Sequence, residues 1–251
     1  MSVAADGVYV YAIVRAGIGL PKSAVGVGAP PAAVRTIRQG ALDAVISDAP
    51  PQLRARRRDL LAHQDLLMRL ADEGPVLPMR FGMVAPDERT VIAQLAVDEP
   101  GHVHVLDRLD GCFEINIKAF PAQNALATLV AEEKSVRQLR EAARKNPGYE
   151  ASVRLGEAIA AALTRRAAAA GQRLHRELGP RARAAAPGPA VSGCALNMSF
   201  LVSRTESDGF LSEAQDFAKA YREHAEIRLA GPLPCYSFVS SDARPVRVGM
   251  H

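Results

Sequence analysis

Two stretches of strict alternation between apolar and polar residues constrain the fold of this chain more than any other feature. In residues 113–118, Phe, Ile and Ile alternate with Glu, Asn and Lys, and residues 194–203 alternate in a similar way. A period of two predicts a β-strand with one face on a core and one face open. Helices are expected between them, over 122–145 and 150–178. This half of the chain therefore favours a small sheet with helices on one side.

The first half of the chain predicts a second unit of the same α+β class. Residues 8–14 read as a strand buried on both faces, and residues 41–47 as another strand. An amphipathic helix is expected over 53–72, followed by an extended segment and by helices after Asp87 and Pro100. The apolar stripe of the first helix consists of Leu53, Leu60, Leu67 and Leu70, with His63 between them.

We therefore predict two α+β domains, residues 1–109 and 110–251. The second carries a long helical insertion at about residues 122–178, whose apolar side chains form a narrow seam. Residues 181–189 are rich in Arg, Ala and Pro and read as a mobile connector.

Charge and composition favour a protein of the cell interior. The chain has 251 residues, with 31 Lys and Arg against 27 Asp and Glu, so its formal net charge is only +4. Three cysteines lie far apart without a C-x-x-C pair, which fits thiols in a reducing compartment. No export signal and no apolar run of spanning length is visible. We expect a soluble, cytoplasmic protein that does not insert into membranes.

No motif for catalysis, for a cofactor or for a metal stands out. The glycines of residues 17–28 lack a following G-K-[ST] and do not open a helix. His63, His102 and His104 have no Cys or acid placed to complete a metal site. We therefore expect no enzyme activity, no cofactor and no bound metal. A basic nucleic-acid or regulatory binding module is the alternative from charge alone, although the polar strand faces lack the aromatic pair that stacks RNA bases.

Two segments are unusual for a purely structural role. In residues 76–82, Arg80 stands among apolar neighbours, so we expect it to be buried. A buried guanidinium needs an anionic or carbonyl partner, with Glu114 or Glu73 as the candidates, or else it anchors a partner chain. Residues 231–239 combine two prolines with bulky side chains, which fits an edge strand, a wrapped terminal segment or an apolar docking patch.

These segments resemble the GvpL/GvpF family of gas vesicle proteins over nearly the whole chain. The resemblance is most specific in Leu-Pro-Met-Arg-Phe-Gly at 77–82 and in Gly-Pro-Leu-Pro-Cys-Tyr-Ser-Phe at 231–238. It extends to residues 9–14, 44–47, 114–118 and 196–202 and to His63. The closing segment departs from the family's usual G-P-W-P-P-Y-S-F, because Leu233 replaces the Trp and Cys235 replaces a Pro.

The resemblance implies two ferredoxin-like domains, the second modified with extra helices. It also implies a minor structural or assembly protein at gas vesicles, associated with the small hydrophobic shell protein and other gas vesicle proteins, and without catalysis.

We expect partner contacts at the two most specific segments. The candidate residues are Arg80, Phe81, Leu233, Tyr236 and Phe238. The sheet edge expected near residues 236–239 and the seam of the long helix offer two docking places for an apolar subunit. Replacing Tyr236 and Phe238 together with Asp is expected to abolish shell-protein binding and to leave the fold intact.

Overall fold

The computed structural model describes residues 7–51 and 53–240. Contacts divide the chain into two compact units. Unit 1 runs as far as Glu114 and takes in the chain again from Pro232, and unit 2 spans Ile115–Gly231. The closing segment therefore packs with the first half of the chain, and the independent folding of 1–109 and 110–251 stays a proposal. No helix in the described ranges is both long and apolar enough to cross a membrane.

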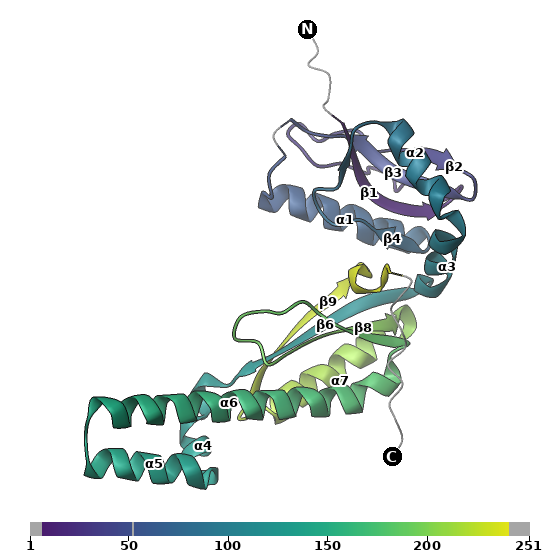
Figure 1. Ribbon diagram of the computed structural model, residues 1–251. Coiled ribbons are helices and arrows are strands. Elements are labelled where there is room, and N and C mark those ends of the chain that lie inside the picture. Colours follow the sequence, from purple (N-terminus) through teal and green to yellow (C-terminus); the bar gives the residue numbers. More distant parts are fainter. Residues whose placement is uncertain (1–6, 52, 241–251) are drawn as a thin grey trace. The chain divides into compact units, whose positions relative to one another are not determined.

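Unit 1 is built on an antiparallel sheet in the strand order β2-β3-β1-β4, with the short β5 also paired to β1. The central strand is the apolar segment with β-branched and aromatic residues that the sequence marks as buried on both faces (Figure 1). The strands are β1 Val8–Arg15, β2 Arg35–Gln39, β3 Leu42–Asp48, β4 Val76–Pro78 and β5 Val84–Ala85.

Helices cover both faces of this sheet, not one face as expected (Figure 1). Leu66, Leu67 and Leu70 of α1 pack against one face. The other face meets α2, whose Val91 and Leu95 line a groove with Val10 and Ile13 of β1. Asp87 begins α2 as predicted, because its carboxylate accepts a hydrogen bond from the Thr90 amide at 2.7 Å. The helices are α1 Arg57–Glu73, α2 Glu88–Val97 and α3 Glu99–Leu109.

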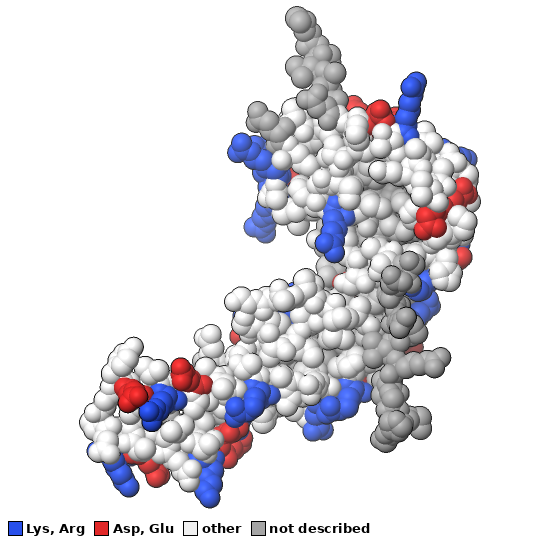
Figure 2. Space-filling view, viewed as in Figure 1, with Lys and Arg blue, Asp and Glu red and all other residues white. Residues whose placement is uncertain are grey.

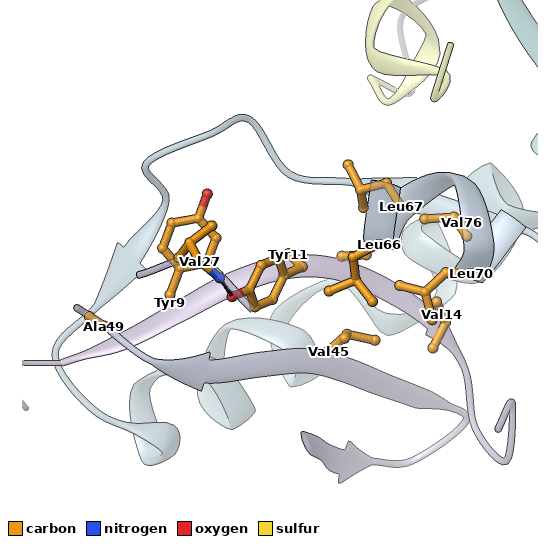
Figure 3. Packing of buried hydrophobic residues seen from close by; sticks show 11 residues of the cluster. Tyr9, Tyr11, Val14, Val27, Val45, Ala49, Leu66, Leu67, Leu70 and Val76 are labelled. Carbon is orange, nitrogen blue, oxygen red and sulfur yellow. Dashed lines mark hydrogen bonds between the residues drawn. The ribbon is translucent and has the colours of Figure 1, made fainter. Parts of the chain in front are cut away.

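A β-bulge in β1 explains how the strand serves both faces. The pairing with β3 shifts between Val10 and Ala12. As a result Tyr9, Tyr11 and Ala12 all lie in the cluster that packs on α1, which Figure 3 shows from close by. In α1 the predicted stripe is wrong at Leu60, which is exposed, while Asp59, His63 and Leu66 are buried.

Unit 2 contains a four-stranded sheet in the order β7-β8-β6-β9. Its strands are β6 Cys112–Pro121, β7 Ala184–Pro187, β8 Leu196–Ser203 and β9 Ala225–Leu233. The prediction of a mobile connector at 181–189 is wrong, because β7 forms there and pairs with β8 from Ala184 to Pro187. This segment has no apolar alternation of its own, and it becomes a strand because its backbone pairs with β8.

Four helices belong to unit 2, and the long α6 is the most prominent (Figure 1). Leu174 and Leu178 of α6 and Phe210 and Phe217 of α7 pack with β6 and β8 into an apolar core. The helices are α4 Leu126–Glu132, α5 Lys134–Lys145, α6 Tyr149–Leu178 and α7 Ser207–Ala220. Short 3₁₀ turns are η1 Gln123–Ala125, η2 Gly179–Arg181, η3 Arg204–Glu206 and η4 Tyr236–Phe238.

The predicted α+β class is confirmed, with two separate antiparallel sheets. Unit 2 follows the β-α-β-β-α-β order of a ferredoxin-like fold, with α4, α5 and α6 together in the place of the first helix. Unit 1 has the corresponding strand order, but a loop replaces the helix between β1 and β2.

The polar side of β6 is buried, contrary to the expectation of an open face. Asn116 donates from its amide to Asn197 Oδ1 at 2.8 Å and to Ser199 Oγ at 3.1 Å. Lys118 donates to Asn116 Oδ1 at 2.8 Å. Alternation in sequence separates the two faces of a strand, but it cannot show whether polar side chains find partners among themselves.

Candidate functional site

The structure brings the two most specific sequence segments onto one core. All five predicted partner-binding residues lie in unit 1. Arg80 and Phe81 follow β4, whereas Leu233 ends β9 and Tyr236 and Phe238 form η4. Phe81 and Tyr236 both pack against the buried cluster of Figure 3, although the two segments are far apart in sequence.

A chain of buried hydrogen bonds holds the loop that carries Arg80 and Phe81. His63 Nε2 lies 3.0 Å from the Met79 carbonyl, which can only accept, so this nitrogen carries the proton. Nδ1 is then the acceptor for the Tyr9 hydroxyl at 2.9 Å. The Tyr9 oxygen in turn accepts from the Gly82 amide at 3.1 Å. Both ends of the loop are therefore tied to one Tyr–His pair.

Aromatic rings fix the same loop from the side. The Phe81 ring meets the His63 ring edge-on, with centroids 5.8 Å apart, and the Tyr9 ring at 6.0 Å. His63 also stacks on Tyr11, with centroids 5.6 Å apart. We refer to Tyr9, His63, Phe81 and the Met79–Gly82 backbone as the loop clamp. The sequence marked His63 only as part of a helix face, and its contacts required the tertiary fold.

Tyr11 anchors a second loop in the same way. Its oxygen accepts from the Val27 amide at 2.8 Å, drawn as a dashed line in Figure 3. Its proton goes to Ser47 Oγ at 2.9 Å, since the Ser47 hydroxyl itself donates to the Asp48 carbonyl. Each hydroxyl in this chain both donates and accepts, which leaves no polar group of the pair unsatisfied.

Burial keeps the loop clamp uncharged at neutral pH. Removal from water raises the pKa of Tyr9 well above the usual tyrosine value and also raises the pKa of Tyr11. The same burial lowers the pKa of His63, only partly offset by its hydrogen bond to Met79. The cluster therefore consists of neutral groups that bond to each other and to backbone, an arrangement suited to holding a loop in place.

Arg80 is exposed, so the expectation of a buried, paired guanidinium is wrong. Glu114, one of its expected partners, instead accepts from the amide and the hydroxyl of Ser237, at 2.7 and 2.8 Å. Within the described ranges, Arg80 forms no ion pair. Because its neighbours Met79 and Phe81 are fixed by the loop clamp, Arg80 is presented to solvent from a rigid position.

The closing segment begins as the end of the edge strand β9, at residues 231–233, and continues as a strap of unit 1, so the sheet edge expected near 236–239 is wrong. Residues 236–238 form the 3₁₀ turn η4, and Phe238 is 0% exposed. Arg108 donates to the carbonyls of Phe238 and Ser240. Burial raises the pKa of the half-buried Tyr236 to about 12. The expectation that Asp at both aromatic positions leaves the fold intact is therefore wrong, because Phe238 belongs to the core.

An apolar groove opens beside the loop clamp, between β1 and α2. It has a volume of about 260 Å³ and is open to solvent. Its rim is apolar, since Met83 is 48% and Val84 41% exposed. The floor and walls come from Val10, Ile13, Met79, Val91 and Leu95. The sequence gives no sign of this groove, because it exists only once α2 has folded over the second face of the sheet.

The described residues were also compared with the requirements of a metal site. Among the residues that the structure describes, no group of three or more His, Cys, Asp and Glu side chains is placed to hold a metal ion. None of the three cysteines, Cys112, Cys194 and Cys235, forms a disulfide bond.

Comparison with known proteins gives one consistent family. A family model described as gas vesicle synthesis protein GvpL/GvpF matches residues 7–240. Gas vesicle protein F of Streptomyces sp. (strain CB03234) is 41% identical over 235 residues, covering 92% of this chain and 98% of that protein. Gas vesicle protein L of the same strain is 32% identical over 257 residues, covering 92% of this chain and 91% of that protein.

Solved structures agree at the level of the fold. The crystal structure of gas vesicle protein GvpF from Anabaena sp. PCC7120 matches with a TM-score of 0.73 at 22% identity, covering 94% of this chain and 98% of that chain. GvpF from Microcystis aeruginosa matches with a TM-score of 0.72, also at 22% identity, over 94% of this chain and 99% of that chain.

Proposed function

The chain belongs to the gas vesicle synthesis protein family GvpL/GvpF, and from this premise we propose that it binds the small hydrophobic shell protein while gas vesicles form. Membership supports a role in gas vesicle formation and gas vesicle proteins as partners. The specific partner and the binding site are our proposal.

Physical chemistry explains why such a partner is needed. A wall that keeps water out of a gas space must present an apolar face, so its free subunits expose apolar surface and tend to aggregate. A partner that covers this surface keeps the subunit available for assembly. The work requires binding and release, so we propose that the protein makes and breaks no covalent bond. We place it in the cytoplasm, at growing vesicles.

The groove beside the loop clamp is the observation that carries this proposal. An exposed apolar rim on an otherwise packed unit suits an apolar partner, and the methionines at 79 and 83 adapt their shape to it. Arg80 stands next to the rim and can bind a carbonyl or a carboxylate of the bound segment. Of the five predicted contact residues, Arg80 keeps this role, and Phe81 holds the loop that carries it. Phe238 acts instead through the core.

The test is capture of the shell protein by variants of the groove rim. The tagged chain is co-expressed with the gas vesicle shell protein of its own host, and the captured shell protein is quantified. Met83→Asp combined with Arg80→Ala is expected to reduce capture at least about tenfold, because a carboxylate at the rim opposes burial of an apolar segment.

The matched control is Val97→Asp, which adds the same charge on α2, where Val97 is 86% exposed. Circular dichroism establishes that both variants are folded. Capture that is unchanged in Met83→Asp with Arg80→Ala, or equally lost in Val97→Asp, rejects the groove as the binding site. Failure of the folded wild-type chain to capture any shell protein rejects the proposed partner.

A further inference from the structure

Helix α5 in unit 2 carries an unbalanced charge on its solvent side. The twelve residues of α5 include five basic side chains and one acidic side chain, and all six of these side chains are exposed. In the described part of the chain, none of the five cations forms an ion pair, and Arg137 only donates to the Ala131 carbonyl at 3.1 Å. The charged residues of α5 are Lys134, Arg137, Arg140, Glu141, Arg144 and Lys145. Figure 2 shows Lys and Arg side chains, with Asp and Glu side chains beside them, over the part of unit 2 formed by α5 and α6.

Four of the five arginines in the neighbouring helix α6 form ion pairs. Arg154 and Arg173 of α6 pair with acids one helical turn away, at 3.1 and 2.8 Å. Arg165 pairs with Glu133 at 3.5 Å, and Arg166 pairs with Glu132. The two helices thus differ in charge balance although they pack together. The excess on α5 is therefore a local feature and does not follow from the Arg-rich composition of the chain.

The spacing of the cations on α5 lowers the stability of this helix when no partner is bound. Arg137, Arg140 and Arg144 are spaced by three and four residues, so neighbouring like charges repel each other. Lys134 and Arg137 also lie near the positive end of the helix dipole, where cations are disfavoured. A partner that brings negative charge to this face removes both penalties.

We infer that the exposed face of α5 binds an acidic α-helix of a partner protein. Guanidinium groups at this spacing lie about 5 Å apart along the helix axis, the same interval as carboxylates spaced by three and four residues on another helix. Arginine also pairs with carboxylates through two parallel hydrogen bonds. The site lies in unit 2, apart from the groove residues, and does not depend on the shell protein as a partner.

Other anionic surfaces fit this face less well. Helix α5 has no aromatic side chain on which an unpaired base can stack. A membrane-binding helix needs a free apolar side. On α5 that side is occupied, because Val136 is buried in a cluster with Leu129 of α4 and Ala162 of α6.

Binding is tested with the full-length chain and a labelled alanine-based helical peptide that carries Glu at i, i+3 and i+7. Fluorescence anisotropy is expected to show binding that weakens as salt is added. The variant Arg137→Gln, Arg140→Gln, Arg144→Gln is expected to bind at least about tenfold more weakly, since three charge pairs are lost. Circular dichroism should show an unchanged fold, because repulsion within α5 is relieved.

The control removes three arginines that are already paired, Arg154→Gln, Arg165→Gln and Arg173→Gln, and should retain the wild-type affinity. Equal loss in the control means that net charge alone drives binding and overturns the inference. An absence of binding by the wild-type chain, or unchanged binding by the α5 variant, also overturns it. Tighter binding to duplex DNA, or to vesicles of phosphatidylcholine and phosphatidylserine, than to the Glu peptide assigns the face to a different partner and overturns it as well.

Discussion

The core that packs on α1 in unit 1 contains polar side chains, whereas the core that packs on α6 and α7 in unit 2 is apolar and the buried Asn116 lies on the other side of β6, although both sheets have corresponding strand orders. Tyr9, Tyr11 and His63 lie in the core of unit 1, with each polar atom bonded to a loop or to a neighbour. The core of unit 2 is filled at the equivalent layer by Phe200, Phe210 and other apolar residues. A core with polar groups requires specific partners, so it fixes loops in one position.

The comparison also separates two kinds of surface. Unit 1 exposes an apolar groove beside a rigidly held loop, whereas unit 2 exposes an unneutralised basic helix. These surfaces suit partners of opposite chemistry, one apolar and one acidic. Our two proposals therefore assign a different partner to each unit.

Loss of the Phe238 ring tests whether the closing strap belongs to the core of unit 1. Phe238→Ala is expected to lower the free energy of unfolding by about 3–5 kcal/mol, because a fully buried ring leaves a cavity. Urea denaturation followed by circular dichroism measures the change. Leu233→Ala, at a half-buried position of the same segment, should cost only about 1 kcal/mol. Equal, small losses at both positions would contradict the assignment of the strap to the core.

Removal of one hydroxyl in each unit tests the difference between the cores. Tyr9→Phe leaves His63 Nδ1 and the Gly82 amide without their partner, so it should cost about 1–3 kcal/mol. Tyr221 of unit 2 stacks on Phe217, and its hydroxyl has no bond to any described residue. Tyr221→Phe should therefore change the free energy of unfolding by less than about 0.5 kcal/mol. The contrast fails if the two substitutions cost the same.

Acidification tests the neutral state of His63. Because the pKa of His63 is lowered in the folded chain, the unfolded chain takes up this proton first, at about pH 6.5. The free energy of unfolding is then independent of His63 above that pH and falls as pH drops below it, by at most about 1.4 kcal/mol per pH unit.

Denaturation at several pH values between about 7 and 5 measures this slope. Histidines gain protons in this range, whereas most carboxylates do so at lower pH. His63→Gln should lose the part of the slope that the imidazole contributes, while its overall stability is lower at pH 7. A slope that is the same in the variant and in the wild type would show that His63 does not titrate differently on folding.

Two glycine-to-alanine substitutions, one in each unit, should change the free energy of unfolding in opposite directions. Gly82 in the loop clamp has φ +90°, and an added methyl group would meet no atom within 4 Å. The backbone conformation itself is strained for alanine, so Gly82→Ala should lower the free energy of unfolding by about 1 kcal/mol. Gly156 lies inside α6 with open space around it, and Gly156→Ala should stabilise the chain by about 0.5–1 kcal/mol. Thermal melts of both variants measure the pair, and a stabilising Gly82→Ala would show that the loop is not held in this conformation.

The sequence predicted most elements correctly because their signals are local. The alternation at 194–203 became β8, the Asp87 cap began α2, and the long helical stretch became α6 within a residue or two of its expected ends. Errors arose where partners decided the outcome. β7 formed from a segment without alternation, and the 236–238 turn replaced an expected sheet edge.

The candidate site was predicted only in part. The segment with Arg80 and Phe81 was identified from its motif, but the sequence indicated a buried Arg80, whereas the structure exposes it. Nothing in the sequence indicated that Tyr9 and His63 would bond to opposite ends of one loop. Those contacts join residues far apart in the chain, and no periodicity records them.

By itself, then, the sequence determined the α+β class, the order of most helices and strands and the family, since local patterning and short motifs suffice for these. Only the tertiary structure decided which polar groups are buried and which apolar groups are exposed. A polar side chain is buried only where folding supplies its hydrogen-bond partner, and an apolar groove exists only where two elements leave a surface uncovered.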